Sequence, residues 1–159
     1  MTASGPLMSV SELTELAGTY EALSPWHVIT QAMIDAFAET TSDHQFIHVD
    51  PAAAARTAFG GTIAHGFLTL SMLSAMAYPI MPRTREAALG INYGFDRIRF
   101  IAPVRSGARI RSRMKLAGCE RRKPEELLCR YDVEVEIEGS DRPALSARWL
   151  TMTMLQQGA

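Results

Sequence analysis

Residues 65–77, with the sequence HGFLTLSMLSAMA, are apolar around almost the whole circumference of a helix. A helix without a polar face has to be enclosed by other structure, because its exposed sides would otherwise leave apolar surface in water. The segment therefore predicts a long, buried central helix. The rest of the chain must supply the structure that covers it.

Two downstream segments have the pattern of that covering structure. Basic side chains alternate with mostly apolar ones over residues 109–116, and mostly acidic side chains alternate with apolar ones over residues 129–138. A period of two is typical of half-buried antiparallel strands. Further strands are expected at residues 26–29, 88–95, 97–102 and 145–155, with a turn at residues 121–124. The sum is an α+β domain in which one antiparallel sheet curves around one buried helix.

Length and charge limit the number of domains and the kind of ligand. A chain of 159 residues, 47% of them hydrophobic, is long enough for one complete core and too short for two ordinary domains, so residues 1–159 are expected to form one domain. Residues 1–55 contain seven acids and no Lys or Arg, whereas residues 56–159 contain sixteen bases and ten acids, so the two parts carry −7 and +6. An anionic ligand is therefore expected to contact the second part. No nucleic-acid partner is expected.

Targeting and cysteine signals are few. The N-terminus lacks the basic and apolar regions of a secretory signal, and no apolar run is long enough to span a membrane. We therefore expect a soluble, cytoplasmic protein. Cys119 and Cys129 could flank a hairpin, but no further Cys or clustered His gives metal-ligand spacing. Reduced thiols and no metal site are expected.

Helix signals precede the central segment. Ser9 or Ser11 can cap a short helix through Leu16, and Thr30 can cap an amphipathic helix that ends near residue 41. Asp50-Pro51 opens an alanine-rich helix through Arg56. Residues 43–48, with the sequence DHQFIH, are expected to form a loop between the last two.

This loop carries the side chains best suited to chemistry. Asp43 and His48 are a carboxylate and an imidazole that a loop can turn toward one cavity, where they can share proton transfers. Gly66, at the start of the central helix, offers an unpaired N–H that favours negative charge, and its missing side chain permits close approach. These are the minimum parts for adding water to a polarised double bond, which predicts a lyase.

Purely structural interpretations remain open for the same residues. Asp43 can be a turn or cap residue, His48 a surface group and His65 a structural residue at a helix start. Ser74, inside the apolar helix, either bonds a carbonyl one turn back or lines a pocket. The basic strand face of residues 109–116 either pairs with the acidic face of residues 129–138 across a hairpin or binds phosphate.

The motifs also carry a resemblance to a known family. DHQFIHVDP at residues 43–51 and FGGTIAHGFL at residues 59–68 resemble the MaoC-like family of hot-dog-fold (R)-specific enoyl-CoA hydratases and dehydratases. The variant DHQFIH is most similar to the nodulation-protein-N-like branch of that family. Residues 99–107, RFIAPVRSG, resemble a strand and turn of the family, so the likeness extends over most of the chain.

The resemblance implies a hot-dog fold, usually dimeric, with a substrate tunnel near the dimer interface. It places Asp43 and His48 on the catalytic pair, Gly66 on the oxyanion-binding amide and Ser74 on a pocket residue. Many members have Asn-Pro where this chain has Gln45-Phe46. Gln45 retains an amide that can orient the pair, whereas Phe46 can reshape the acyl pocket.

The leading hypothesis is reversible syn hydration of a trans-2-enoyl-CoA to an (R)-3-hydroxyacyl-CoA by a homodimer. Coenzyme A is part of the substrate, and no cofactor is required because the thioester already polarises the alkene. The residues expected to bind substrate are Gln45, Phe46, His65, Ser74, Arg97, Arg99 and Arg105, with the arginines meeting the phosphates. Two alternatives are an acyl-CoA thioesterase of the same fold and a non-catalytic acyl-CoA-binding partner subunit.

Overall fold

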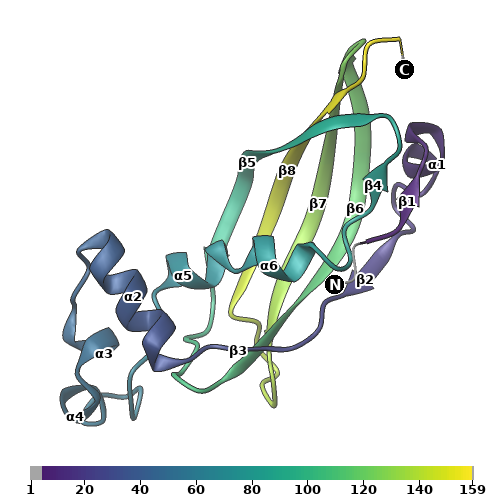
Figure 1. Ribbon diagram of the computed structural model, residues 1–159. Coiled ribbons are helices and arrows are strands. Elements are labelled where there is room, and N and C mark those ends of the chain that lie inside the picture. The colour runs from purple at the N-terminus through teal and green to yellow at the C-terminus, as the bar shows by residue number, and fades with distance from the viewer. Residues whose placement is uncertain (1–4, 159) are drawn as a thin grey trace.

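The computed structural model describes residues 5–158, and its main feature is an antiparallel sheet that curves around a helical segment (Figure 1). The sheet has six strands in the order β2-β6-β7-β8-β5, with β3 also paired to β6. The bounds are β2 Glu21–Leu23, β3 His27–Val28, β5 Ala87–Phe100, β6 Arg109–Lys123, β7 Glu126–Ile137 and β8 Leu145–Leu155. A separate two-stranded sheet joins β1 (Leu7–Met8) to β4 (Arg83–Thr84).

The helices lie on the inner side of the sheet and on two opposite sides of the molecule (Figure 1). The segments α5 (Gly66–Ser71) and α6 (Leu73–Ala77) cross the inner face, and α2 (Gln31–Thr41), α3 (Phe46–Val49) and α4 (Pro51–Ala54) gather beyond α5. The helix α1 (Val10–Glu15) lies apart from these, on the opposite side beside β6. The predicted caps are confirmed at Ser9, Thr30 and Asp50, whose side chains accept from the first turns of α1, α2 and α4. None of the helices within residues 5–158 is long and apolar enough to cross a membrane.

One hydrophobic core joins the helices to the sheet. Leu68, Leu73 and Met76 of α5 and α6 are each at most 7% exposed. They share the core with the inward residues of the central strands, which include Ile110, Met114, Leu116, Tyr131, Val133 and Val135. Burying a large apolar side chain contributes about 1.5–3 kcal/mol. The predicted α+β arrangement, a sheet around an apolar helix, is thus confirmed.

The central helical segment differs from the predicted one in continuity and in burial. It is broken at Met72 into α5 and α6 instead of running unbroken over residues 65–77. Five residues are exposed on one side: Phe67, Ser71, Ser74, Ala75 and Tyr78. Spacings of three and four residues gather most of these on a single helix face. The expectation that structure encloses the segment on every side is therefore wrong for the single chain.

Two other segments also differ from the sequence-based expectation. The strands expected at residues 88–95 and 97–102 are one strand, β5, whose register shifts between Asn92 and Gly94 and between Phe95 and Arg97. Residues 46–48, expected in a loop, belong to α3, and the His48 side chain in this turn is 7% exposed.

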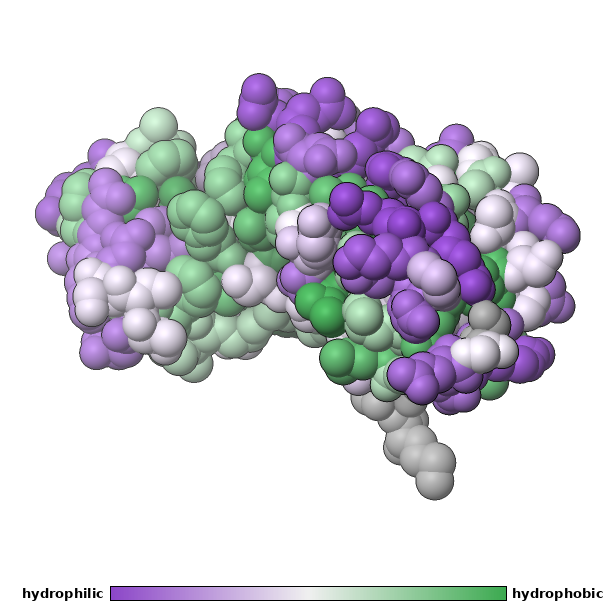
Figure 2. All heavy atoms as spheres, turned by 90° about the horizontal axis from the view of Figure 1, so that it is seen from above, coloured by the Kyte–Doolittle hydropathy of each residue, from purple (hydrophilic) through white to green (hydrophobic). Residues whose placement is uncertain are grey.

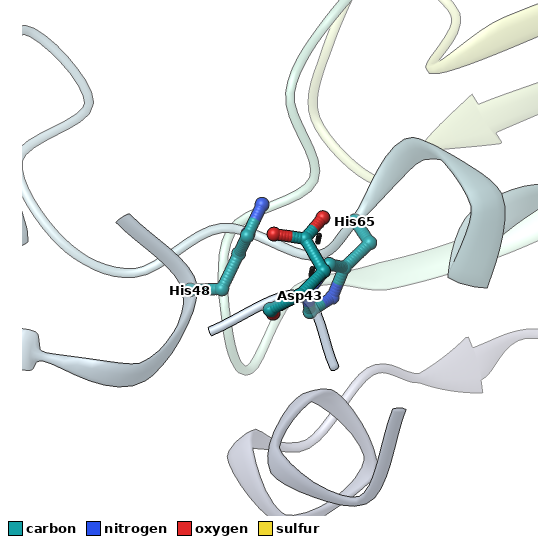
Figure 3. Close-up of side chains that lie close together, drawn as sticks. All are labelled: Asp43, His48 and His65. Atoms are coloured by element: carbon teal, nitrogen blue, oxygen red, sulfur yellow. Dashed lines mark hydrogen bonds and ion pairs between the residues drawn. The ribbon is translucent and has the colours of Figure 1, made fainter. Parts of the chain in front are cut away.

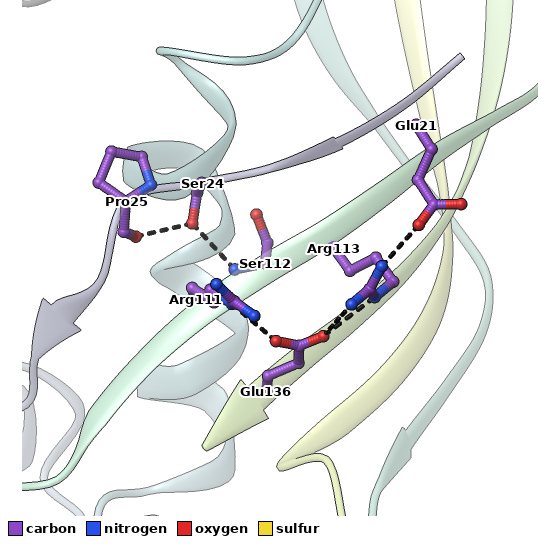
Figure 4. Close-up of polar contacts among 7 residues, drawn as sticks. All are labelled: Glu21, Ser24, Pro25, Arg111, Ser112, Arg113 and Glu136. Carbon is purple, nitrogen blue, oxygen red and sulfur yellow. Dashed lines mark hydrogen bonds and ion pairs between the residues drawn. The ribbon is translucent and has the colours of Figure 1, made fainter. Parts of the chain in front are cut away.

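The outer face of the β6–β7 hairpin is a set of paired charges (Figure 4). Arg111 and Arg113 both bind Glu136, and Arg113 also binds Glu21 at 2.7 Å. Arg109 pairs with Glu138 at 2.7 Å. The interpretation of the basic strand face as a cross-hairpin partner of the acidic face is thus confirmed. The same pairs leave this face poorly suited to binding phosphate.

The expectation of reduced cysteines is wrong in this structure. Cys119 and Cys129 are directly opposite in the β6–β7 register, with Cα atoms 4.2 Å apart, and form a disulfide. Directly opposed residues on neighbouring antiparallel strands bring their side chains close together. The pairing depends on strand register, which the spacing of two cysteines does not reveal.

The Glu136 cluster predicts a pH-dependent contribution to stability. Partial burial alone would raise the pKa of Glu136, but hydrogen bonds and charges from Arg111 and Arg113 outweigh burial and lower the pKa below its ordinary 4.5. The carboxylate therefore stabilises the fold at neutral pH, and this stabilisation is lost as the pH falls through the folded-state pKa. Glu136→Gln should lower the free energy of unfolding by about 1 kcal/mol at pH 7.

Urea unfolding at several pH values measures the difference in the free energy of unfolding between Glu136→Gln and the native chain. This difference should stay constant at neutral pH and shrink once the pH falls below about 4.5, the ordinary pKa of a glutamate side chain. Glu134→Gln is the matched control, because Glu134 lies opposite Arg113 on the same strand but is exposed and makes no ion pair with a described residue; this change should alter stability less. An equal loss in both variants, or a difference that persists in acid, would contradict the role given to Glu136.

Candidate active site

A cleft of about 230 Å³ opens where α5 begins, beside the end of β5. Its polar lining comes from His48 and Thr69 and from the backbone around Gly66. The remaining wall is mostly apolar and consists of Ile63, Ala64, Phe100, Ile101, Ala102, Pro103, Val104 and Ala144. Segments far apart in the sequence thus meet at the N-terminal end of the central helical segment.

His48 is held in one orientation by the chain just before α5. Its Nδ1 atom lies 2.7 Å from the carbonyl oxygen of Ile63, and the side chain is 7% exposed. A carbonyl only accepts hydrogen bonds, so Nδ1 carries a hydrogen, and Nε2 bears the lone pair when the ring is neutral. Among the described residues, Nε2 has no hydrogen-bond partner. This nitrogen is therefore available to a ligand or a water molecule.

The backbone of His48 is held from the other side by α2. Gln31 Nε2 donates to the carbonyl oxygen of His48 at 2.7 Å, and Gln31 Oε1 accepts from Thr62 Oγ1 at 2.6 Å. A backbone bond from Ile63 to Ile47 adds a third tie at 3.0 Å. These contacts fix α2, α3 and the segment before α5 relative to one another.

Asp43 enters the site from the end of α2. Ser42 ends that helix with a φ of 59°, in the left-handed region, and the chain then turns into Asp43. The Asp43 side chain is 55% exposed, and its Oδ2 atom lies 4.0 Å from His65 Nε2 (Figure 3). Asp43, His48 and His65 each offer one atom to a group whose members are all within 4.8 Å of one another.

Contacts within this group compete with metal binding. The rings of His48 and His65 are stacked, with centroids 3.7 Å apart and planes 26° from parallel. His65 Nε2 also lies 2.9 Å from the Asp43 carbonyl oxygen and needs its hydrogen for that bond. The arrangement instead suits proton transfer, with a carboxylate beside an imidazole whose second nitrogen is open.

Gly66 supplies a backbone donor on the wall of the same cleft. It is the first residue of α5, so its N–H has no partner within the helix. A Cβ atom at this position would lie 3.0 Å from the Phe100 ring, tighter than ordinary van der Waals contact. Glycine therefore allows the helix start and the end of β5 to approach each other closely.

Of the residues predicted to act on substrate, four come together: Asp43, His48, His65 and Gly66. Gln45 begins α3 without a side-chain capping bond, and Phe46 is 46% exposed. Neither residue lines the cleft. Ser74 is exposed on α6, whereas Thr69, on the adjoining helix, lines the cleft in its place.

The three predicted arginines differ in where they lie relative to the cleft. Phe100 lines the cleft and Ile98 packs against the core, so Arg97 and Arg99, at the intervening positions, lie on the opposite face of the sheet. Arg105 follows the cleft residue Val104, and its guanidinium lies near Gly60. Of the three, Arg105 is the one beside the cleft.

Sequence reasoning missed Thr69, Phe100 and the Ile63 carbonyl. Thr69 is 3% exposed and its Oγ1 lies 3.4 Å from the His65 carbonyl oxygen. A polar residue three positions after the predicted oxyanion glycine was a usable signal for Thr69. The roles of Phe100 and of a main-chain carbonyl depend on tertiary contacts that no local pattern encodes.

Fold and site together define a class of protein, a hot-dog fold with a carboxylate–imidazole pair at the start of its central helix. Residues 14–137 match the MaoC like domain family, and the chain belongs to this family. The R-hydratase PhaJ1 of Pseudomonas aeruginosa, in its unliganded form, has the same fold with a TM-score of 0.67 and 22% identity. That match covers 91% of this chain and 86% of the hydratase.

Two relatives are more similar in sequence. Nodulation protein N of Rhizobium meliloti is 52% identical over 146 residues, covering 91% of each chain. The 3-hydroxyacyl-thioester dehydratase Z of Mycobacterium tuberculosis is 42% identical over 139 residues, covering 87% of this chain and 91% of the dehydratase. The resemblance inferred from the motifs, including the nodulation-protein-N-like branch, is confirmed.

Proposed function

We propose that this protein is a lyase, an (R)-specific enoyl-CoA hydratase that reversibly adds water to a trans-2-enoyl-CoA. The observation that carries the proposal is that His48 and Gly66 line one cleft while the Asp43 carboxylate lies beside His48. The family match and the similarity to a 3-hydroxyacyl-thioester dehydratase support it, because dehydration is the reverse of this reaction.

The open His48 Nε2 atom and the Asp43 carboxylate hold one water molecule over C3 of the substrate. As the water oxygen forms its bond to C3, His48 Nε2 accepts a proton and the C2–C3 π electrons move onto the thioester. The proton then returns to C2 through the same pair. Because both groups act from one side of the alkene, hydroxyl and hydrogen add syn. General acid–base catalysis of this kind contributes about 10²- to 10⁴-fold.

The charge that develops on the thioester oxygen needs a donor that is already in place. The Gly66 N–H, free of helical partners and at the positive end of the helical segment, serves this purpose. No metal or redox cofactor is required, because the thioester itself polarises the double bond. The acyl chain lies along the apolar wall that Phe100 and Val104 contribute.

Coenzyme A requires a cation at the mouth of the cleft. Arg105 is exposed and adjoins the cleft wall, so it is the arginine we assign to a phosphate of coenzyme A. Arg97 and Arg99 lie on the far face of β5 and are not included in this assignment.

Replacing Asp43 with Asn tests the proposed chemistry. The substitution keeps the size of the side chain but removes its charge, so hydration should fall about 10²- to 10⁴-fold. Loss of the enoyl-thioester absorbance of crotonyl-CoA and of longer trans-2-enoyl-CoAs measures the rate, and a dehydrogenase specific for one enantiomer identifies the product. Asp50→Asn, which retains the cap of α4, is the matched control and should keep full activity.

Full hydratase activity in Asp43→Asn would contradict the mechanism. Release of free thiol from acyl-CoA without a hydration product would instead identify a thioesterase. Tight binding of acyl-CoA, measured by calorimetry, with no turnover at any chain length would favour a non-catalytic binding subunit.

We further propose that the protein is a homodimer joined along β5. This strand is an edge of the six-stranded sheet, runs over Ala87–Phe100 and exposes Leu89, Ile91 and Tyr93 at 43–57%. A long, apolar edge strand is a site for pairing with another chain. The exposed face of α5 and α6 provides further apolar surface, and a hydrophobic band crosses the middle of the molecule in Figure 2.

Sedimentation equilibrium should therefore show a dimer that Ile91→Lys converts to monomer. A lysine on the pairing edge leaves a charge that the interface cannot solvate. Leu23→Lys, on β2 at the other side of the sheet, is the matched control because Leu23 is a similarly exposed residue of an edge strand. A monomeric native chain, or a dimer unaffected by Ile91→Lys, would exclude this interface.

A further inference from the structure

His65 does not occupy the position of a substrate-binding residue, although it lies in the middle of the site. The side chain is 3% exposed and is absent from the lining of the cleft. Its Nε2 atom donates to the main-chain carbonyl of Asp43 at 2.9 Å. Its ring stacks on that of His48, with the ring centroids 3.7 Å apart. His65 thus contacts both members of the proposed catalytic pair, Asp43 and His48, without lining the cleft.

Asp43 needs such an anchor. It follows the last turn of α2, and its carboxylate is largely exposed. Among the described residues, His65 is the one that makes a hydrogen bond to Asp43. His48, by contrast, is already tied through Ile63 and Gln31. His65 is therefore the residue whose hydrogen bond links the main chain of Asp43 to the core beside the imidazole.

A second observation separates this role from ordinary packing. His65 Nδ1 is buried without a hydrogen-bond partner. A buried polar atom in this state costs free energy, and an apolar ring of similar shape would fill the site without that cost. The histidine is therefore not explained by stability, whereas its Nε2–H has a definite partner in the Asp43 carbonyl.

We propose that His65 is a positioning residue, which holds the main chain of Asp43 through Nε2–H and the ring plane of His48 through stacking. The proposal rests on the proposed hydratase function for its catalytic consequence, but the anchoring of Asp43 can be measured without any turnover. It replaces the expectation that His65 contacts substrate.

Three substitutions of His65 distinguish the effect of its Nε2–H donor from the effect of its ring. Phe and Leu at position 65 remove the donor, while Gln places an amide N–H near the position of Nε2. For His65→Phe and His65→Leu, kcat for crotonyl-CoA should fall about 10- to 100-fold with KM changed by less than about threefold, because positioning is lost and not binding. His65→Gln should stay within about fivefold of the native kcat. His44→Gln is the matched control, since this exposed neighbour bonds Glu39 instead of Asp43 and should leave kcat unchanged.

NMR order parameters supply the readout that does not depend on activity. Backbone order parameters of residues 43–45 should fall from about 0.85 toward about 0.6 in the Phe and Leu variants and remain near native in the Gln and His44→Gln proteins. Thermal melts should show the Phe variant at least as stable as the native chain, and Leu provides the comparison if Phe does not fold.

A native kcat with unchanged order parameters in His65→Phe or His65→Leu would overturn the proposal, and so would a Gln variant no better than these. If the native chain hydrates no enoyl-CoA, the proposed function fails, and the order parameters alone then decide whether His65 anchors Asp43. If Asp43→Asn is inactive while His65→Phe is fully active, the function stands and the role of His65 does not.

Discussion

The packing of α5 and α6 against the inner face of the sheet is the contact on which the rest of the structure depends. Leu68, Leu73 and Met76 fix the helical segment in the core, and this in turn fixes where α5 begins. Every polar group of the candidate site is placed relative to that point. Gly66 is the first residue of α5, His65 precedes it, and the Ile63 carbonyl that orients His48 lies just before both.

The site thus combines the end of the core with a turn at the surface. The imidazole of His48 is held by bonds to its ring and to its backbone, from Ile63 and Gln31. Asp43 comes from a turn at the surface, and the contact with His65 links that turn to the core. The Asp43 carboxylate is 55% exposed, while the His48 ring beside it is sheltered from water.

Much of the fold follows from periodicity in the sequence. The strands β6 and β7 were predictable from their period of two, and α5 and α6 from their apolar sequence. Both patterns record which residues avoid water, and this can be read from the residues themselves. The break at Met72, the exposed helix face and the union of two expected strands into β5 were not predictable, because they depend on packing between distant segments. The disulfide likewise requires the register that sets Cys119 opposite Cys129.

The candidate site was likewise predictable only in part. Asp43, His48 and Gly66 were recognisable because their chemistry and spacing are carried by a short motif. Ser74 and Thr69 were not distinguished, since five residues rotate the side chain by about 140° around a helix and only the packed structure shows which side meets the cleft. The pleat of β5 places Arg97 and Arg99 on the face of the sheet opposite the cleft, and the sequence alone did not show which face that was.

The central claim is that one carboxylate and one imidazole act on a single face of the substrate. The measurement that tests it most directly is hydration of a trans-2-enoyl-CoA in D2O, followed by NMR determination of the relative configuration at C2 and C3. Deuterium and hydroxyl added to the same face, in a single diastereomer with the (R) configuration at C3, is the predicted result. Addition to opposite faces, or a mixture of diastereomers formed at the first turnover, would contradict the account.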